Sequence, residues 1–247
     1  MNEPVLRLDG VAKTYASGTA ALAPTSFEIA RGSLVSLVGP SGCGKSTLLR
    51  IMADLLPASS GSITRGDGLG ETGFVFQDAT LMPWATIQAN VALPLSLKKR
   101  PMDNVAPTLK RVGLDGFAHA YPRELSGGMK MRASIARAVV TNPDLLFMDE
   151  PFAALDEFTR FRLNDDLLQL WQQNTWTVIF VTHSIREAVF LSQRVIVMSA
   201  RPGRVIADVA IDLPTHRDED VRASHAFADQ CQRIGALMRA AAEEPVR

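Results

Sequence analysis

The sequence predicts an α/β protein with an inserted helical segment, because apolar runs of strand length alternate with stretches of helical periodicity. "SLVSLVG" at 33–39 reads as a buried strand, and "KSTLLRIMADLL" at 45–56 as a helix that follows a glycine-rich loop. A second apolar run, "LLFMDEP" at 145–151, ends in two carboxylates. Between these strands, 125–140 has apolar residues at helical spacing. We therefore expect a sheet core with a mostly helical lobe inserted into it.

The composition restricts the class of protein. The chain has 26 lysine and arginine residues and 26 aspartate and glutamate residues, so its formal net charge is zero. This charge does not indicate nonspecific nucleic-acid binding. Two cysteines, Cys43 and Cys231, and a start without a basic and then apolar segment favour a reducing cytoplasm over secretion. The longest uncharged run, 79–97, contains Pro83 and Pro94 and falls short of the about 20 apolar residues of a membrane-spanning helix.

"GPSGCGKST" at 39–47 predicts a nucleoside triphosphate site. Its three glycines let successive backbone N–H groups turn inward around an anion, and the helix that follows adds the positive end of its dipole. Lys45 is expected to reach the β and γ phosphates, and Ser46 to offer its hydroxyl to Mg²⁺. A glycine-rich turn that happens to precede a helix is the alternative. The loop residues assigned to the nucleotide are Gly39, Pro40, Ser41, Gly42, Cys43, Gly44, Lys45, Ser46 and Thr47.

Two carboxylates end the strand at 145–151. Successive side chains of a strand face opposite ways, so Asp149 and Glu150 can have different roles. We assign Asp149 to Mg²⁺, directly or through water, and Glu150 to polarising the attacking water as a general base. A strand that ends in two surface acids is the alternative.

A second anion-binding helix start is predicted at "LSGGMKMRASIARAVV", 125–140. Ser126 is placed to cap the helix, and two glycines follow it. One triphosphate does not need two such sites, unless the second serves a nucleotide held by another subunit. An ordinary amphipathic helix with a glycine-rich start is the alternative. The face of this helix carries Met129, Ala133, Ala136 and Val140.

These motifs resemble those of the ATP-binding cassette (ABC) ATPases over nearly the whole chain, together with Gln77 in "FVFQD", "ALD" at 154–156 and His183 in "VIFVTH". The resemblance implies a P-loop NTPase core with an inserted helical subdomain, and an ATPase that works as a homodimer closed head to tail around two ATP molecules. Each site then joins the P-loop of one subunit to the signature of the other, formed by Ser126, Gly127 and Gly128. Met129 stands where many members have glutamine.

The same resemblance implies roles for single residues. Tyr15 stacks on adenine, and Gln77 contacts Mg²⁺ and the attacking water. His183 holds the γ-phosphate and Asp156 contacts the opposite site. The catalytic set is then Glu150, His183, Gln77 and Lys45, and the metal set Ser46, Gln77 and Asp149. An ordinary edge-strand tyrosine and a structural histidine are the alternatives.

The chain is expected to be one ABC ATPase domain. Residues 1–77 and 141–213 would form the nucleotide-binding core, 78–140 the helical signature subdomain, and 214–247 a helical tail. "QDATLMPWATIQANVALPL" places apolar residues at 81–84, where a permease could dock; packing into the core is the alternative. This stretch, with "THSIREAVFLSQRVIVMSARPGR", looks most like the nitrate, sulfonate and taurine importer ATPases.

Membership of that group implies import of a small organic or inorganic anion through a separate permease, fed by an extracytoplasmic solute-binding protein. The chain would lie at the cytoplasmic face of the inner membrane, without a nucleic-acid partner. The alternatives are a soluble ABC ATPase that acts on DNA or ribosomes, and an unrelated P-loop kinase. One cassette without coiled coils disfavours the first, and the signature disfavours the second.

Overall fold

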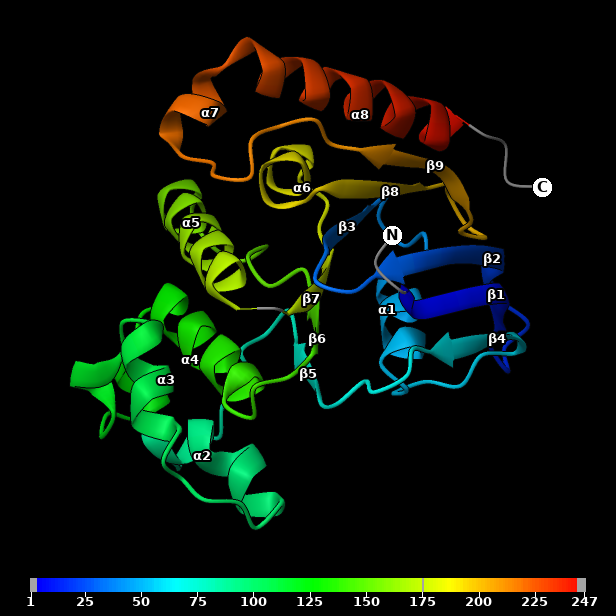
Figure 1. The fold of residues 1–247 in the computed structure, drawn as a ribbon. Helices are drawn as coiled ribbons and strands as arrows, with labels where there is room; N and C mark the ends of the chain where they lie inside the picture. Colours follow the sequence, from blue (N-terminus) through cyan, green and yellow to red (C-terminus); the bar gives the residue numbers. More distant parts are fainter. Residues whose placement is uncertain (1–3, 175, 244–247) are drawn as a thin grey trace. The chain divides into compact units, whose positions relative to one another are not determined.

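The computed structural model describes residues 4–174 and 176–243, which divide into two compact units (Figure 1). The first unit comprises Met1–Leu69 and Thr177–Arg247, and the second comprises Gly70–Trp176. The sequence predicts another division, in which a helical signature subdomain at 78–140 interrupts the nucleotide-binding core. That division stays a prediction. Each unit is described by itself below.

The first unit contains two groups of strands. A three-stranded antiparallel sheet has the order β2-β1-β4. The other strands follow the order β7-β3-β8-β9, in which β3 is parallel to β7 and β8, and β9 is antiparallel to β8. Every residue of β3 and β7 is buried, as expected for parallel strands covered on both faces. The strands are β1 (Pro4–Thr14), β2 (Ala20–Ala30), β3 (Leu34–Val38), β4 (Ser60–Arg65), β7 (Thr177–Val181), β8 (Arg194–Met198) and β9 (Val205–Ala210).

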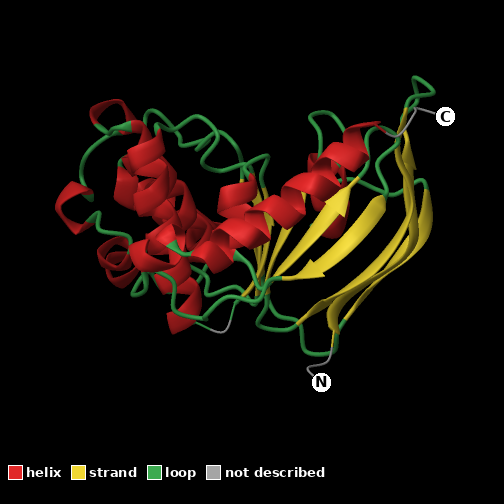
Figure 2. Ribbon diagram, turned by 90° about the horizontal axis from the view of Figure 1, so that it is seen from above, coloured by secondary structure: helices red, strands yellow, loops and turns green. Residues whose placement is uncertain are grey.

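Four α-helices belong to the described part of the first unit: α1 (Lys45–Met52), α6 (Ile185–Leu191), α7 (Glu219–Ala223) and α8 (His225–Glu243). Helices α7 and α8 lie within 214–247, which the sequence analysis predicts as a helical tail, and residues 244–247 of that tail lie outside the described residues. Helix α8 packs on α6 and β8, and it is the long red helix that lies in front of yellow strands in Figure 2.

Helix α1 ends earlier than the sequence pattern predicts. The predicted helix runs to residue 56, but the structure ends it at Met52. Asp54 has a φ of 60°, and the N–H groups of Asp54 and Leu55 donate to the carbonyls of Ile51 and Arg50. This is the Schellman arrangement, in which a left-handed residue closes the helix and satisfies its last carbonyls. Aspartate here takes the place usually held by glycine.

The second unit pairs the parallel strands β5 (Thr72–Val75) and β6 (Leu145–Asp149), and its described residues also form four α-helices. Helix α4 lies at the centre, since it packs against α2, α3 and α5. The helices are α2 (Ile87–Leu97), α3 (Val105–Arg111), α4 (Gly127–Val139) and α5 (Glu157–Gln173), with 3₁₀ turns η1 (Asp115–Phe117) and η2 (Pro122–Glu124). The inserted region is thus mostly helical, as the sequence predicts.

None of the helices within residues 4–174 and 176–243 has the length and apolar character that a bilayer crossing requires.

Candidate functional site

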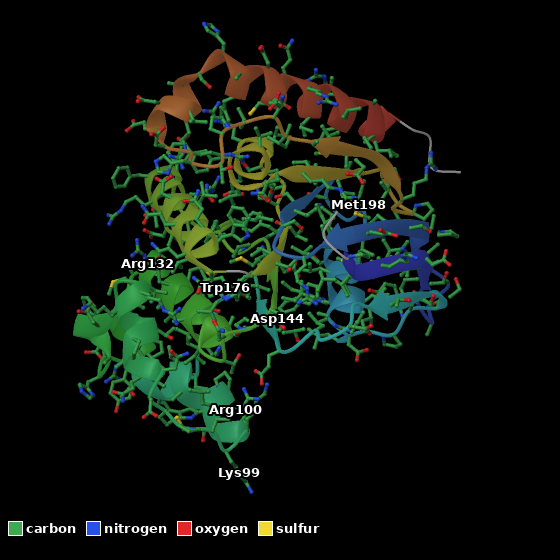
Figure 3. All side chains as sticks on the ribbon, in the orientation of Figure 1. Lys99, Arg100, Arg132, Asp144, Trp176 and Met198 are labelled. Atoms are coloured by element: carbon green, nitrogen blue, oxygen red, sulfur yellow. The ribbon has the colours of Figure 1, made fainter. Side chains whose placement is uncertain are left out.

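The glycine-rich loop lies between β3 and α1, and its glycines are needed for two different reasons. Gly42 and Gly44 have φ angles of 73° and 103°, in the left-handed region that favours glycine. At Gly39 the backbone angle is ordinary, but a Cβ would lie 2.9 Å from the carbonyl oxygen of Met198, which is labelled in Figure 3. Any side chain at 39 would therefore push the loop away from β8.

Lys45 lies inside this loop and is only 4% exposed. Its Nζ donates to the carbonyl oxygens of Gly39 at 2.9 Å and Pro40 at 3.1 Å, and lies 3.9 Å from the Sγ of Cys43. A buried ammonium group held by carbonyls needs a negative charge to offset its lost hydration. The donor set, one ammonium beside glycine N–H groups at a helix start, fits a phosphate chain. Cys43 is buried.

The predicted adenine-stacking residue lies beside the same loop. The Tyr15 hydroxyl and the Oγ1 of Thr47 are 3.1 Å apart, within hydrogen-bond distance. The side chain is 40% exposed, and the Nζ of Lys13 lies 5.6 Å from the centre of the Tyr15 ring. An aromatic face is therefore accessible next to the phosphate loop. Ser46 is the second residue of α1 and is half-buried.

His183 is exposed and follows β7, directly beside β3 in the sheet. Because β3 and β7 are parallel, the loop that follows β3 and the histidine that follows β7 leave the same edge of the sheet. The residues on both sides of His183 are fixed: Thr182 donates to the carboxylate of Glu187, and the Ser184 side chain caps α6 by accepting from the Glu187 N–H at 3.3 Å. Glu187 was not predicted from the sequence.

In the second unit, Asp149 and Glu150 end β6, and Gln77 follows the parallel strand β5. These three residues therefore leave one edge of the strand pair. Asp149 is 4% exposed, whereas Gln77 is exposed. Glu150 has a φ of 46°, unusual for a residue with a side chain and often found at functional sites. Asp149 is the last residue of β6, and Glu150 follows it in a left-handed backbone conformation.

The described residues contain no group of three or more His, Cys, Asp or Glu side chains that could hold a metal ion by itself. The Mg²⁺ ligands predicted from the sequence belong to both units, Ser46 to the first and Gln77 and Asp149 to the second, and this set stays a prediction.

The signature helix begins as expected. The Ser126 Oγ accepts from the N–H of Met129 at 3.3 Å and caps α4. A Cβ at Gly128 would lie 2.6 Å from the Cγ2 of Thr159, and one at Gly127 would lie 3.3 Å from Leu155. Both glycines therefore allow the start of α4 to approach the region around the start of α5.

A cavity of about 340 Å³ opens beside this helix start, and Arg132 and Arg162 give it a positive lining. Arg132, labelled in Figure 3, also forms an ion pair with Asp166. The cavity is lined by Gly113, Phe117, Ser126, Gly128, Met129, Arg132, Thr159 and Arg162. Its charge agrees with an anion-binding surface at the signature.

Asp156 has a structural function in addition to the predicted contact with the opposite site. Its carboxylate accepts from the N–H of Thr159 at 2.9 Å and caps α5. The hydrogen bonds from Thr159 lower the pKa of the Asp156 carboxyl, so it stays ionised.

Sequence reasoning missed Arg137, which lies in the last turn of α4. Its guanidinium donates to the carbonyl oxygens of Ala79 at 2.9 Å and Thr80 at 2.8 Å, and to the Thr80 hydroxyl at 2.8 Å. The signature helix is thereby joined to the segment that follows Gln77.

Residues 22–153 match the model of the ABC transporter family. The chain belongs to this family. It is 44% identical over 221 residues to the aliphatic sulfonates import ATP-binding protein SsuB of Bacillus cereus, covering 86% of this chain and 88% of that protein. The ABC ATPase fold, ATP binding and ATP hydrolysis predicted from the sequence are confirmed by this membership.

Solved ABC cassettes have the same fold. The chain is similar to cbiO1 of Clostridium perfringens, part of an ABC transporter complex, with a TM-score of 0.78 and 28% identity, covering 96% of this chain and all of that one. A dimeric structure of the cassette MJ0796 bound to ADP and Pi gives a TM-score of 0.73 and 32% identity, covering 85% of this chain and all of that one.

Proposed function

We propose that this ABC ATPase energises uptake of a small organic or inorganic anion, such as a sulfonate, taurine or nitrate, through a separate permease. The observation that carries the proposal is Trp84, whose side chain is 76% exposed seven residues after Gln77. Pro83 is also exposed, and Leu81 and Met82 are partly accessible. Large exposed apolar groups rimmed by polar residues mark sites of protein contact. The similarity to a sulfonate import protein supports the class of substrate.

The second unit also has a cavity of about 460 Å³, which is lined in part by Thr80, the residue that precedes the segment 81–84. Its walls are mostly apolar and come from β5, the segment after it, α2 and α4; the lining residues are Thr72, Gly73, Phe74, Phe76, Thr80, Leu93, Pro94, Leu97, Lys98, Arg137, Ala138 and Thr141. Arg137 joins this cavity to the segment after Gln77. A permease segment seated here would therefore contact the residues that connect the nucleotide-sensing glutamine to the signature helix.

The proposal gives single residues the roles that the resemblance to ABC ATPases implies. Lys45 and the loop N–H groups bind and orient the phosphates, and Tyr15 supports the adenine. Glu150 accepts a proton from the attacking water, while Gln77 and His183 orient that water and the γ-phosphate. Mg²⁺, when bound at Ser46, Gln77 and Asp149, supplies positive charge against the phosphate oxygens.

The proposal is tested by deleting the gene in its host and measuring growth on single nutrient sources. An alkanesulfonate, taurine and sulfate serve in turn as the sulfur source, and nitrate as the nitrogen source. We expect the deletion to abolish growth on one of the imported anions while growth on the other sources is unchanged. Wild-type growth of the deletion strain on every source would contradict the importer function.

Variants in the complementing gene test the docking surface. Trp84→Ala should fail to restore growth, because loss of an aromatic anchor of about 2 kcal/mol lowers the affinity for the partner about 30-fold. The purified variant should hydrolyse ATP as the wild type does. Leu55→Ala is the matched control, since Leu55 is 55% exposed and lies in the first unit. Full complementation by Trp84→Ala would remove this residue from the docking surface.

A further inference from the structure

Arg217, in the segment between β9 and α7, is buried against the C-terminal end of α6. Its side chain is 5% exposed. The Nη1 atom donates to the carbonyl oxygens of Val189 at 2.8 Å, Phe190 at 2.8 Å and Ser192 at 2.9 Å. Its Nε donates to the carbonyl of Pro214 at 2.8 Å. One guanidinium group thus gathers the last carbonyls of α6.

This arrangement satisfies a physical need of the helix. The last carbonyls of a helix have no donors within it, and the negative end of the dipole attracts a cation. Burial lowers the pKa of Arg217 to about 10, so the side chain remains charged near neutral pH. Removing the guanidinium would leave several buried carbonyls without their donor.

Other residues of the tail also contact α6. The guanidinium of Arg222 lies 3.6 Å from the centre of the Phe190 ring, and Phe227 of α8 meets Phe190 edge-on with ring centres 6.5 Å apart. The Arg186 guanidinium, near the start of α6, lies 4.9 Å from the centre of the Phe227 ring. The tail therefore contacts α6 near both of its ends, and Figure 1 shows α7 and α8 running past this helix.

The other end of α6 holds the residues around His183. Glu187, in the first turn of α6, accepts a hydrogen bond from the Thr182 hydroxyl. That hydroxyl accepts in turn from the Ser184 N–H at 3.0 Å. Thr182 and Glu187 are both buried, so the backbone that carries His183 is fixed to α6. A shift of α6 along or about its axis must move His183 with it.

We propose that residues 214–243 brace α6 and that Arg217 is a positioning residue for His183 in ATP hydrolysis. The inference rests on the role proposed above for His183. Arg217 donates to the backbone at the end of α6 and to Pro214, so it acts on His183 through the helix. The tail thus has a function in the ATPase cycle, although it carries none of the nucleotide motifs.

The test uses the full chain and compares Arg217→Met with Arg217→Lys and with Arg233→Met. Arg233 is an exposed arginine of α8, so its variant is a matched control for loss of one charge from the tail. We expect Arg217→Met to lower kcat about tenfold, because small displacements of positioned groups have effects of this size or larger. The KM for ATP should change less than about twofold, since Tyr15 and the loop are unaltered. Arg217→Lys should recover part of kcat, and Arg233→Met should be unchanged.

A double-mutant cycle separates positioning from general destabilisation. In the His183→Ala background, measured by single turnover with excess enzyme, Arg217→Met should have less than about a twofold further effect. A full tenfold further loss would overturn the proposal, because Arg217 would then act independently of His183. If Arg217→Met does not fold, the same cycle is measured with Arg217→Lys and with Phe227→Leu. The Phe227→Leu change loosens α6 without altering Arg217.

The two hypotheses fail in different ways. If His183→Ala hydrolyses ATP as the wild type does, the role of His183 is wrong. If His183→Ala loses hydrolysis while Arg217→Met, Arg217→Lys and Phe227→Leu keep the wild-type kcat, the brace alone is wrong.

Discussion

Substituting alanine for Gly44 should destabilise the protein more than the same change at Gly42, although both glycines belong to one loop. Gly44 has a φ of 103°, and a Cβ there would lie 2.7 Å from the Ala21 carbonyl oxygen and 2.8 Å from the Cδ2 of Leu22. The Ala21 carbonyl accepts from the Gly203 N–H at 3.0 Å, so it cannot move without breaking that hydrogen bond. The new methyl group therefore meets fixed backbone.

The expected magnitude follows from two contributions. A non-glycine residue held at positive φ costs about 1–2 kcal/mol. Overpacking against a part of the structure that cannot relax adds about 1–3 kcal/mol. Gly44→Ala should then lower the free energy of unfolding by about 3 kcal/mol. Gly42 has a φ of 73°, but its Cβ would meet only the Nη2 of Arg201 at 3.4 Å, the end of a flexible side chain. Gly42→Ala should cost about 1–2 kcal/mol.

Urea unfolding followed by circular dichroism, without nucleotide, measures both variants against the wild type. The difference between the two losses isolates the contact with Ala21 and Leu22 from the cost of positive φ. Titration with a fluorescent ATP analogue reports whether the surviving fold still binds. Equal losses for Gly42→Ala and Gly44→Ala would refute the packing argument, and a neutral Gly44→Ala would refute the positive-φ argument as well.

Two further predictions concern dimerisation and acid stability. A hydrolysis-deficient Glu150→Gln chain should shift from monomer toward dimer when ATP is added, as read by light scattering at high protein concentration. Adding Ser126→Arg to this variant should abolish the shift. Dimerisation of the double variant with ATP would contradict the composite site. Burial of Glu71 raises its pKa, but hydrogen bonds from Lys98 and Thr141 and the charges of Lys98 and Arg100 outweigh this effect and hold the pKa below 4.5. The lowered pKa stabilises the fold above about pH 4.5, and this contribution is lost as pH falls through the folded-state pKa. Glu71→Gln should therefore melt below the wild type at about pH 6, and the difference should shrink as the pH falls below about 4.5. A difference that stays constant with pH would exclude titration of Glu71.

Local motifs were predictable because their causes lie within a few residues. The glycines of the phosphate loop, the Ser126 cap and the strand that ends in Asp149 all follow from backbone conformation and side-chain alternation over short stretches. The end of α1 was not predictable in this way, because Asp54 adopts a left-handed conformation that the pattern of apolar residues does not indicate. The docking hypothesis left Trp84 either exposed or in the core, and the structure makes it exposed. Periodicity could not decide this, since the segment before α2 has no regular secondary structure.

Sequence reasoning missed Arg137 and Arg217, and both show why hydrogen bonds between residues far apart in the sequence could not be predicted. Arg137 donates to carbonyls 57 and 58 residues away, and Arg217 to carbonyls 25 to 28 residues away. Every residue has a carbonyl, so no residue type marks the acceptors, and a search for complementary charges finds nothing. The geometry nevertheless selects arginine, because a planar group with several donors can bind two or three carbonyls at once, whereas lysine presents a single ammonium. Lysine at 217 should therefore keep the charge at the end of α6 but bind fewer of its carbonyls, which is why only partial recovery of kcat is expected from Arg217→Lys.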